Sequence, residues 1–274
     1  MTALAELPPL RESLEAHGLL ARKSLGQHFL LDLNITRKIA RLAAVGDGDL
    51  VIEVGPGPGG LTRALLETGA EVVAIEKDAR FLPLLEELGA AAPGKLRVEL
   101  ADALRADEVE IAAGRPANIV SNLPYNVGTP LLVKWLTGPF QPAAMTLMFQ
   151  KEVAQRIVAA PGASAYGRLA VIAQACAQAQ IVMDAPARAF TPPPKVDSAV
   201  VRLTPRADRP APALLEALQT VTAAAFGQRR KMLRSSLKTL GGEALCASAG
   251  IDPARRAETL SIAEFQGLAA ALGR

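Results

Sequence analysis

The sequence predicts an open α/β fold with a mostly parallel sheet, followed by a small all-helical domain. Two observations support this prediction. From residue 50 to residue 203, short apolar runs alternate with segments of helical periodicity, which is the pattern of β-α units with helices on both faces of one sheet. After residue 205, a linker rich in proline and charged residues is followed by helical patterns only. We therefore predict a first domain over residues 1–205 and a helical domain over residues 206–274.

The expected strands are short and apolar, and helical segments separate the first five of them. The strands are predicted at residues 50–54, 72–75, 96–100, 118–121 and 145–149, with two more near 181–183 and 198–203. The helices of this domain are predicted at 32–44, with Asp32 as N-cap, and at 61–68, 78–88, 107–112, 129–136 and 152–159. Beyond the linker, helices are predicted at 214–226, 230–240 and 262–272.

The composition indicates a soluble, cytoplasmic protein without a metal site, and we expect a monomer. Lys and Arg number 30 against 27 Asp and Glu, a net charge too small to indicate nucleic-acid binding by itself. Cys176 and Cys246 lack CxxC spacing and only two histidines are present, so buried reduced thiols are expected and a zinc site is not. The N-terminus reads as a polar leader without the apolar core of a signal peptide, and no run has the roughly 18 apolar residues of a membrane span.

A glycine-rich turn, residues 55–60, directly follows the strand at 50–54. In open α/β sheets, ligands bind at the carboxyl ends of the strands, and glycines let the backbone approach the ligand closely. The next strand ends at Glu76, whose carboxylate can accept hydrogen bonds from two ribose hydroxyls. The third strand is followed by Asp102, which can accept from an adenine amino group. The sequence therefore predicts a site for an adenosine-containing cofactor.

Two such cofactors fit this pattern. Gly55, Gly57 and Gly60 satisfy the GxGxxG motif, and Glu76 follows Gly55 by 21 residues, close to the spacing of about 20 in NAD-binding proteins. On these features alone the two cofactor classes are equally supported. Asp102 favours an adenosyl cofactor, and the residues after the fourth strand decide between the two.

The fourth strand runs into the segment Asn122-Leu123-Pro124-Tyr125. An adenine amino nitrogen is a poor nucleophile because its lone pair is delocalised into the ring. The Asn122 side-chain oxygen and the Leu123 carbonyl can accept its two hydrogens and free that lone pair, while Pro124 restricts the backbone before it. Tyr125 offers a stacking face for a base turned out of its RNA context.

This segment resembles the motif of the ribosomal RNA adenine dimethyltransferases, the KsgA/RsmA family. Five motifs occur in the order that the family has them, over about residues 20–272. The motifs are Gly26-Gln27-His28-Phe29-Leu30, Glu53-Val54-Gly55-Pro56-Gly57, Asn122-Leu123-Pro124-Tyr125, Phe190-Thr191-Pro192-Pro193-Pro194-Lys195-Val196-Asp197-Ser198 and Phe226-Gly227-Gln228-Arg229-Arg230-Lys231.

The resemblance implies a Rossmann-like, seven-stranded methyltransferase fold that uses S-adenosyl-L-methionine. It implies dimethylation of two adjacent adenines in the loop of the 3′-terminal helix of 16S rRNA, late in small-subunit biogenesis. Phe190 is implied as the second stacking face for the base. His28 stands where the family often has Asn. The implied cofactor contacts are His28, Leu30, Gly55, Gly57, Glu76, Asp102 and Asn122.

The predicted RNA-facing surface lies mainly in the helical domain. Residues 206–274 contain ten Lys and Arg against six Asp and Glu, and the stretch 228–238 has five basic residues and no acid. Such a run gains from contact with a polyanion, and phosphate contacts position RNA without reading its sequence. Arg22 and Lys23 extend this surface in our interpretation. The candidate RNA-binding residues are Lys195, Arg229, Arg230, Lys231 and Arg234.

Two rival functions remain open at this point. One is an Erm-type enzyme that methylates 23S rRNA, against which the segments 190–198 and 228–231 favour the small-subunit branch. The other is a non-catalytic assembly or RNA-binding factor built on the same fold. The intact segment 122–125, together with Glu76 and Asp102, favours an active enzyme.

Overall fold

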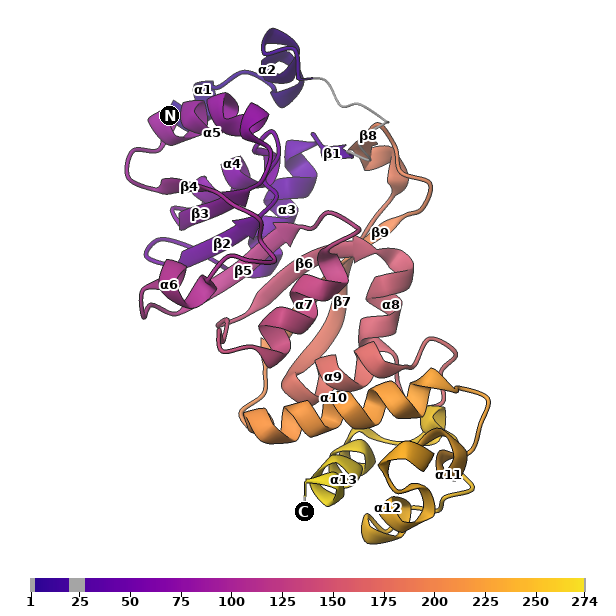
Figure 1. Ribbon diagram of the computed structural model, residues 1–274. Helices are drawn as coiled ribbons and strands as arrows, with labels where there is room; N and C mark the ends of the chain where they lie inside the picture. Colours follow the sequence, from indigo (N-terminus) through magenta and orange to yellow (C-terminus); the bar gives the residue numbers. More distant parts are fainter. Residues whose placement is uncertain (1–2, 20–27, 274) are drawn as a thin grey trace. The chain divides into compact units, whose positions relative to one another are not determined.

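The computed structural model describes residues 3–19 and 28–273, and its centre is a sheet of seven strands (Figure 1). The strand order is β4-β3-β2-β5-β6-β9-β7. The predicted α/β class with a mostly parallel sheet is confirmed. The strands are β2 (Leu50–Val54), β3 (Glu71–Glu76), β4 (Leu96–Leu100), β5 (Ala117–Asn122), β6 (Met145–Gln150), β7 (Ala177–Ala185) and β9 (Ser198–Pro205).

The strand order creates a switch point between β2 and β5. β2 pairs in parallel with both β3 and β5, β3 pairs with β4, and β5 pairs with β6. β9 runs antiparallel to β6. The chain thus proceeds outward from β2 to β4 and then returns to β5. The carboxyl ends of β2, β3 and β5 meet at this point, where open α/β sheets bind ligands.

Most of the predicted helices form, with shifted ends. Asp32 caps the first of them, accepting from the Asn34 backbone at 2.8 Å. The segment predicted to be helical from residue 78 begins as a 3-10 turn, η2 (Ala79–Phe81). The helices of the α/β region are α3 (Leu33–Ala43), α4 (Gly60–Leu66), α5 (Leu82–Ala91), α6 (Glu108–Ala112), α7 (Gly128–Thr137), α8 (Lys151–Val158) and α9 (Arg168–Cys176). The last of these was not predicted, because most of its residues are buried and its amphipathic period is weak.

The interpretation of the N-terminus as a polar leader was wrong. Two short helices form there, α1 (Ala3–Glu6) and α2 (Leu10–Ala16); Leu4 is buried in the first, and Leu10 and Leu14 are buried in the second. The segment between them is held by the buried Arg63 of α4, which donates to the carbonyls of Leu7 and Pro8. Arg22, Lys23, Gly26 and Gln27 lie outside the described residues.

A two-residue antiparallel pair brings distant parts of the chain together. β1 (Phe29–Leu30) pairs with β8 (Phe190–Thr191), so that Leu30 lies opposite Phe190. The sequence did not predict this pair. Such short strands have no periodicity to detect, and the pairing forms only because the fold brings the two segments together.

The chain divides into two compact units. The first comprises residues 1–132, 139–154 and 181–203, and the second comprises residues 133–138, 155–180 and 204–274. In the second unit, α10 (Pro212–Gly227) packs against α9 and α13 (Ile262–Leu272). The functional division at residue 205 remains a prediction.

The helix predicted over residues 230–240 does not form as one element. The chain turns after α10 and then makes α11 (Leu233–Ser236), the 3-10 turn η4 (Lys238–Leu240) and α12 (Gly242–Ser248). Tertiary contacts override the local helical preference here. The Leu233 backbone donates to the Arg255 carbonyl, and Gly241 adopts φ 107° to reverse the chain.

The remaining sequence predictions concern cysteines, metals and membranes. Both cysteines are buried and free, as predicted. Within residues 3–19 and 28–273, no group of three or more His, Cys, Asp or Glu is placed to hold a metal ion. None of the helices in that same part of the chain combines the length and apolar character needed to cross a bilayer.

Candidate active site

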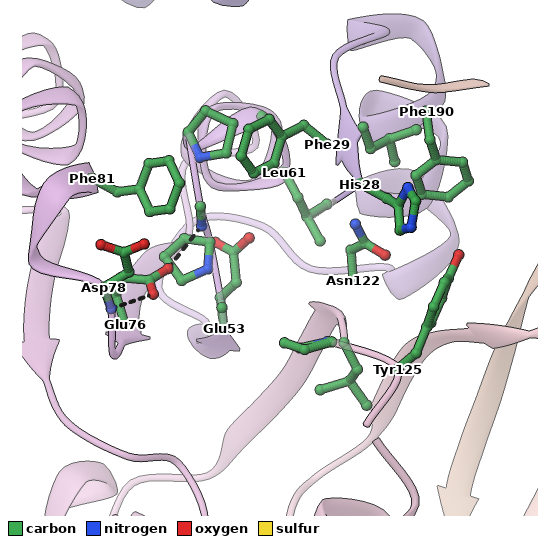
Figure 2. Close-up of a pocket in the computed structure, with 18 of the residues that line it drawn as sticks. His28, Phe29, Glu53, Leu61, Glu76, Asp78, Phe81, Asn122, Tyr125 and Phe190 are labelled. Atoms are coloured by element: carbon green, nitrogen blue, oxygen red, sulfur yellow. Dashed lines mark hydrogen bonds between the residues drawn. The ribbon is translucent and has the colours of Figure 1, made fainter. Parts of the chain in front are cut away.

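A cavity of about 390 Å³ opens at the carboxyl ends of β2, β3 and β5, within the first compact unit (Figure 2). Figure 2 shows Glu53, Glu76 and Asp78 toward one end of it, with Phe81 beside them, and His28, Tyr125 and Phe190 toward the other, with Asn122 between. We call Glu53, Glu76 and Asp78 the acidic end. We call His28, Tyr125 and Phe190 the aromatic end.

Glu76 organises the acidic end. Its side chain is 7% exposed and accepts backbone hydrogen bonds from Gly57 at 3.0 Å and from Lys77 and Asp78 at 2.8 Å each. The last residue of β3 thereby fixes the glycine loop that follows β2. Gly55 needs its lack of a side chain, because its φ is 66° and a Cβ would lie 3.2 Å from Pro124.

Glu53 is a second carboxylate of this end that the sequence reasoning did not single out. It is 1% exposed, lines the cavity and accepts a 2.7 Å hydrogen bond from the Thr62 hydroxyl. Burial raises the pKa of Glu53 to about 8. The Thr62 hydrogen bond opposes this rise, and the negative charge of Glu76 adds to it. A carboxylate inside the otherwise apolar run 50–54 was the available signal, since an isolated buried acid calls for an explanation.

Asp102 follows the end of β4, as expected, and its role as a cofactor contact stays a prediction. It is not among the residues that line the cavity, and it forms a 2.9 Å ion pair with Lys77. The hydrogen bonds from Lys77 and from the Leu104 backbone hold the pKa of Asp102 below its ordinary value. Asp78 and Phe81 line the cavity instead. Asp78 lies two residues after the end of β3, so it was detectable as a second acid near Glu76.

The predicted catalytic segment lies between the two ends. Asn122 is the last residue of β5 and lines the cavity with Leu123, Pro124 and Tyr125. Ser121, just before it, is buried and donates to the Val54 carbonyl at 2.6 Å. This bond ties the end of β5 to the end of β2, so the segment starts from a fixed point.

The aromatic end combines Tyr125 with residues of the β1–β8 pair. The half-buried Tyr125 shares a 2.9 Å hydrogen bond with the Ser198 hydroxyl, and burial raises the pKa of Tyr125. Phe190 is 2% exposed, so most of its ring belongs to the hydrophobic core and only part of it faces the cavity. Tyr125 therefore presents more ring surface to a ligand than Phe190 does.

His28 lies at the aromatic end beside Tyr125. The two ring centroids are 6.1 Å apart and the planes are tilted by 31°, a contact distance that leaves no room for a base between them. His28 Nδ1 lies 2.7 Å from the Pro192 carbonyl oxygen. Since a carbonyl only accepts, this bond assigns the proton to Nδ1 and leaves Nε2 of the neutral ring as an acceptor.

The predicted RNA-binding residues fall into two groups. Lys195 is exposed in the first unit, and Arg230, Lys231 and Arg234 are exposed in the second. Arg229 differs from them, because its guanidinium donates to the carbonyls of Ser164 and Tyr166 and pairs with Glu258 at 3.4 Å. Its charge is already engaged within the protein, which argues against the phosphate contact predicted for it.

The cavity has the parts needed to hold two ligands side by side. The acidic end can accept hydrogen bonds from hydroxyl groups and can stabilise a cation. The aromatic end can stack on a flat base. The Asn122 side-chain oxygen lies between them, where it can accept from an amino group.

The chain matches known proteins over almost its whole length. The family model described as "Ribosomal RNA adenine dimethylase" matches residues 18–272. "Ribosomal RNA small subunit methyltransferase A" of Phenylobacterium zucineum is 74% identical over 267 residues, which cover 97% of this chain and 93% of that protein.

Two solved structures of methyltransferases are similar. A dimethyladenosine transferase from Plasmodium falciparum has a TM-score of 0.74 at 25% identity, covering 88% of this chain and 96% of that one. The 23S rRNA methyltransferase ErmE has a TM-score of 0.67 at 27% identity, covering 90% of this chain and all of that one. The 74% identity to the small-subunit methyltransferase, against 27% to ErmE, disfavours the Erm-type alternative. The match to a methylase family disfavours NAD as the cofactor. The chain belongs to the ribosomal RNA adenine dimethylase family.

Proposed function

We propose that the protein transfers methyl groups from S-adenosyl-L-methionine to the amino groups of two adjacent adenines in the loop of the 3′-terminal helix of 16S rRNA. The observation that carries the proposal is a single cavity in which an acidic end and an aromatic end meet at Asn122. Family membership and the small-subunit relative support the choice of substrate.

The residues of the acidic end fit the cofactor. Glu76 can accept from the ribose hydroxyls, and the turn at Gly55 and Gly57 lets the chain pass close to the ligand. Leu30 also lines the cavity. When bound, the cofactor supplies an electrophilic methyl group on a sulfonium. NAD carries no such group.

Asn122 and Leu123 would act on the target adenine. The Asn122 amide oxygen and the Leu123 carbonyl accept hydrogen bonds from the two amino hydrogens. These bonds withdraw the lone pair of the amino nitrogen from conjugation with the adenine ring. Asn suits this position because it accepts without placing a full negative charge beside a sulfonium. Tyr125 and Phe190 hold the base, and most of the rate then comes from positioning. No strong base is needed, since the proton can leave after the methyl group has been transferred.

The proposal extends to the setting in which the enzyme acts. Its partner is 16S rRNA within the small ribosomal subunit, which places it in the cytoplasm as a late biogenesis factor. Residues 1–205 carry the catalysis, and residues 206–274 contact the subunit through Arg230, Lys231 and Arg234. We propose that it works as a monomer and without a metal ion.

Glu76→Ala is expected to weaken binding of S-adenosyl-L-methionine by about 1.5–3 kcal/mol, the scale of a charged hydrogen bond. Calorimetric titration measures this, and wild-type protein should show no binding of NAD. Asp102→Ala is the matched control. Because Asp102 lies outside the cavity wall, it should weaken binding less than Glu76→Ala does. An equal loss would restore Asp102 as a direct contact, and binding of NAD alone would refute the cofactor assignment.

Changing Arg230, Lys231 and Arg234 together to Ala is expected to weaken binding to the small subunit and to flatten its dependence on salt. Each phosphate contact removed lowers the slope of the logarithm of the binding constant against the logarithm of the salt concentration by about 0.7–1 in magnitude. Arg229→Ala is the contrasting variant and should lower stability instead, because it removes contacts within the second unit. An unchanged salt slope in the triple variant would show that these residues form only a solvated face.

The substrate is tested by offering labelled S-adenosyl-L-methionine with purified small and large subunits from a strain that lacks this activity. The proposal predicts label in 16S rRNA of the small subunit. Label in 23S rRNA would support an Erm-type enzyme. Tight binding to the small subunit without any label would support a non-catalytic assembly factor.

A further inference from the structure

We infer that Ser198 is a positioning residue for methyl transfer, whose hydroxyl holds the Tyr125 ring in the orientation that receives the target base. The inference rests on the proposed function. It adds a residue that takes no part in the chemistry described above and that touches neither the base nor the methyl donor in that scheme.

Ser198 is a rigid anchor. It is fully buried as the first residue of β9, and it lies opposite Gln150 of β6 in the antiparallel register. The residue before it is also fixed. The Asp197 carboxylate accepts from the Ala187 backbone at 2.8 Å, and the Asp197 carbonyl accepts from the Lys151 backbone at 2.9 Å. The hydroxyl of Ser198 therefore has a defined position set by the sheet.

Tyr125, by contrast, lies in a turn between β5 and α7. Its phenolic oxygen is 2.9 Å from the Ser198 Oγ, so a residue outside regular structure is tied to one inside the sheet. The bond crosses from the end of β5 over β6 to β9, because these three strands are neighbours. A buried hydroxyl of this kind contributes orientation as well as stability.

The catalytic segment thereby has an anchor at each end. Ser121 ties its beginning to the Val54 carbonyl of β2, and Ser198 ties Tyr125 to β9. The two acceptors for the target amino group, on Asn122 and Leu123, lie between these anchors. Holding the ring thus also limits the movement of the acceptors, on which in-line transfer depends.

The size of the effect follows from the freedom that the ring would regain. A base stacked on an aromatic ring is stabilised only when the ring is in place, and immobilising a side chain on binding has an entropic cost. Loss of the hydroxyl pair should therefore lower the rate by about three- to tenfold, the factor for freezing one side chain. It should leave cofactor affinity unchanged, since neither hydroxyl belongs to the acidic end.

A double-mutant cycle tests this directly. Tyr125→Phe and Ser198→Ala each remove one side of the same hydrogen bond while keeping the ring and the strand. Single-turnover methylation of small subunits at saturating S-adenosyl-L-methionine should fall by about three- to tenfold in each. The double variant should be no slower than either single variant, because the bond can be lost only once.

The chain contains two tyrosines, and the second is the matched control. The Tyr166 hydroxyl donates to the Leu260 carbonyl at 2.9 Å in the second unit. Tyr166→Phe should lower the melting temperature and leave the rate normal. If Ser198→Ala also lowers the melting temperature and leaves the rate normal, the role of Ser198 is structural only and the inference is wrong.

The other outcomes are equally decisive. If the two losses of methylation rate multiply in the double variant, the two hydroxyls act independently and the inference is overturned. If Ser198→Ala does not fold, Tyr125→Phe decides alone, and a normal rate overturns it. A wild-type enzyme that methylates no small subunits refutes the proposed function, and this inference with it. If the wild-type enzyme is active and the rate losses of the two single variants multiply in the double variant, the inference is refuted and the proposed function stands.

Discussion

Replacing Asn122 by alanine is expected to lower the single-turnover rate of methyl transfer by about 10²–10³-fold, the usual cost of removing one polar group that stabilises a transition state. The amide oxygen matters most as positive charge develops on the adenine nitrogen, so the loss falls on the chemical step rather than on binding. Tyr125 and the exposed basic residues remain in the variant. Affinity for the small subunit should therefore change little.

The measurement needs saturating S-adenosyl-L-methionine, because Asn122 lines the cavity and its loss can also weaken the cofactor. Subunit binding is measured in parallel by filter retention. A near-normal rate under these conditions would show that this side chain does not activate the adenine. Loss of binding in step with activity would instead assign Asn122 a docking role.

Glu53→Gln is expected to remove a pH dependence from the stability of the protein. Burial raises the pKa of Glu53 to about 8, whereas an unfolded glutamate titrates near its ordinary value of about 4.3. Between these values the native carboxyl keeps a proton that the unfolded chain has lost. The stability that this group contributes is therefore fully present below about pH 4.3 and is lost as the pH rises through about 8.

At about 1.4 kcal/mol per pKa unit, the difference between about 4.3 and about 8 corresponds to at most about 5 kcal/mol. Urea unfolding at several pH values between 5 and 9 measures it. The wild-type curve should fall relative to the Glu53→Gln curve as the pH rises. Parallel curves would show that Glu53 is ionised in the native state and that its burial has no such cost.

The sequence predicted the sheet well because its signals are local. β3 and β5 are short, mostly apolar runs, and the polar residue that ends each of them marks the edge where ligands bind. Glu76 and Asn122 could therefore be assigned to one site from the sequence alone. Both line the same cavity.

The sequence failed where tertiary contacts decide. The pairing of Leu30 with Phe190 joins segments that are far apart in the chain and too short to show a period. The predicted helix at 230–240 breaks because the Leu233 backbone pairs with Arg255 instead of continuing a helical ladder. Residue type alone could not show that Arg229 is engaged by carbonyls of its own chain, or that Lys77 pairs with Asp102.

The identity of the product tests the central claim most directly. Small subunits from a strain lacking this activity are incubated with the enzyme and S-adenosyl-L-methionine, and the 16S rRNA is digested to nucleosides for chromatography and mass spectrometry. The account predicts N6,N6-dimethyladenosine from two adjacent positions, and a large reduction of this product with Asn122→Ala. Methyl groups on another base, on ribose or on ribosomal protein, or no methyl incorporation at all, would contradict it.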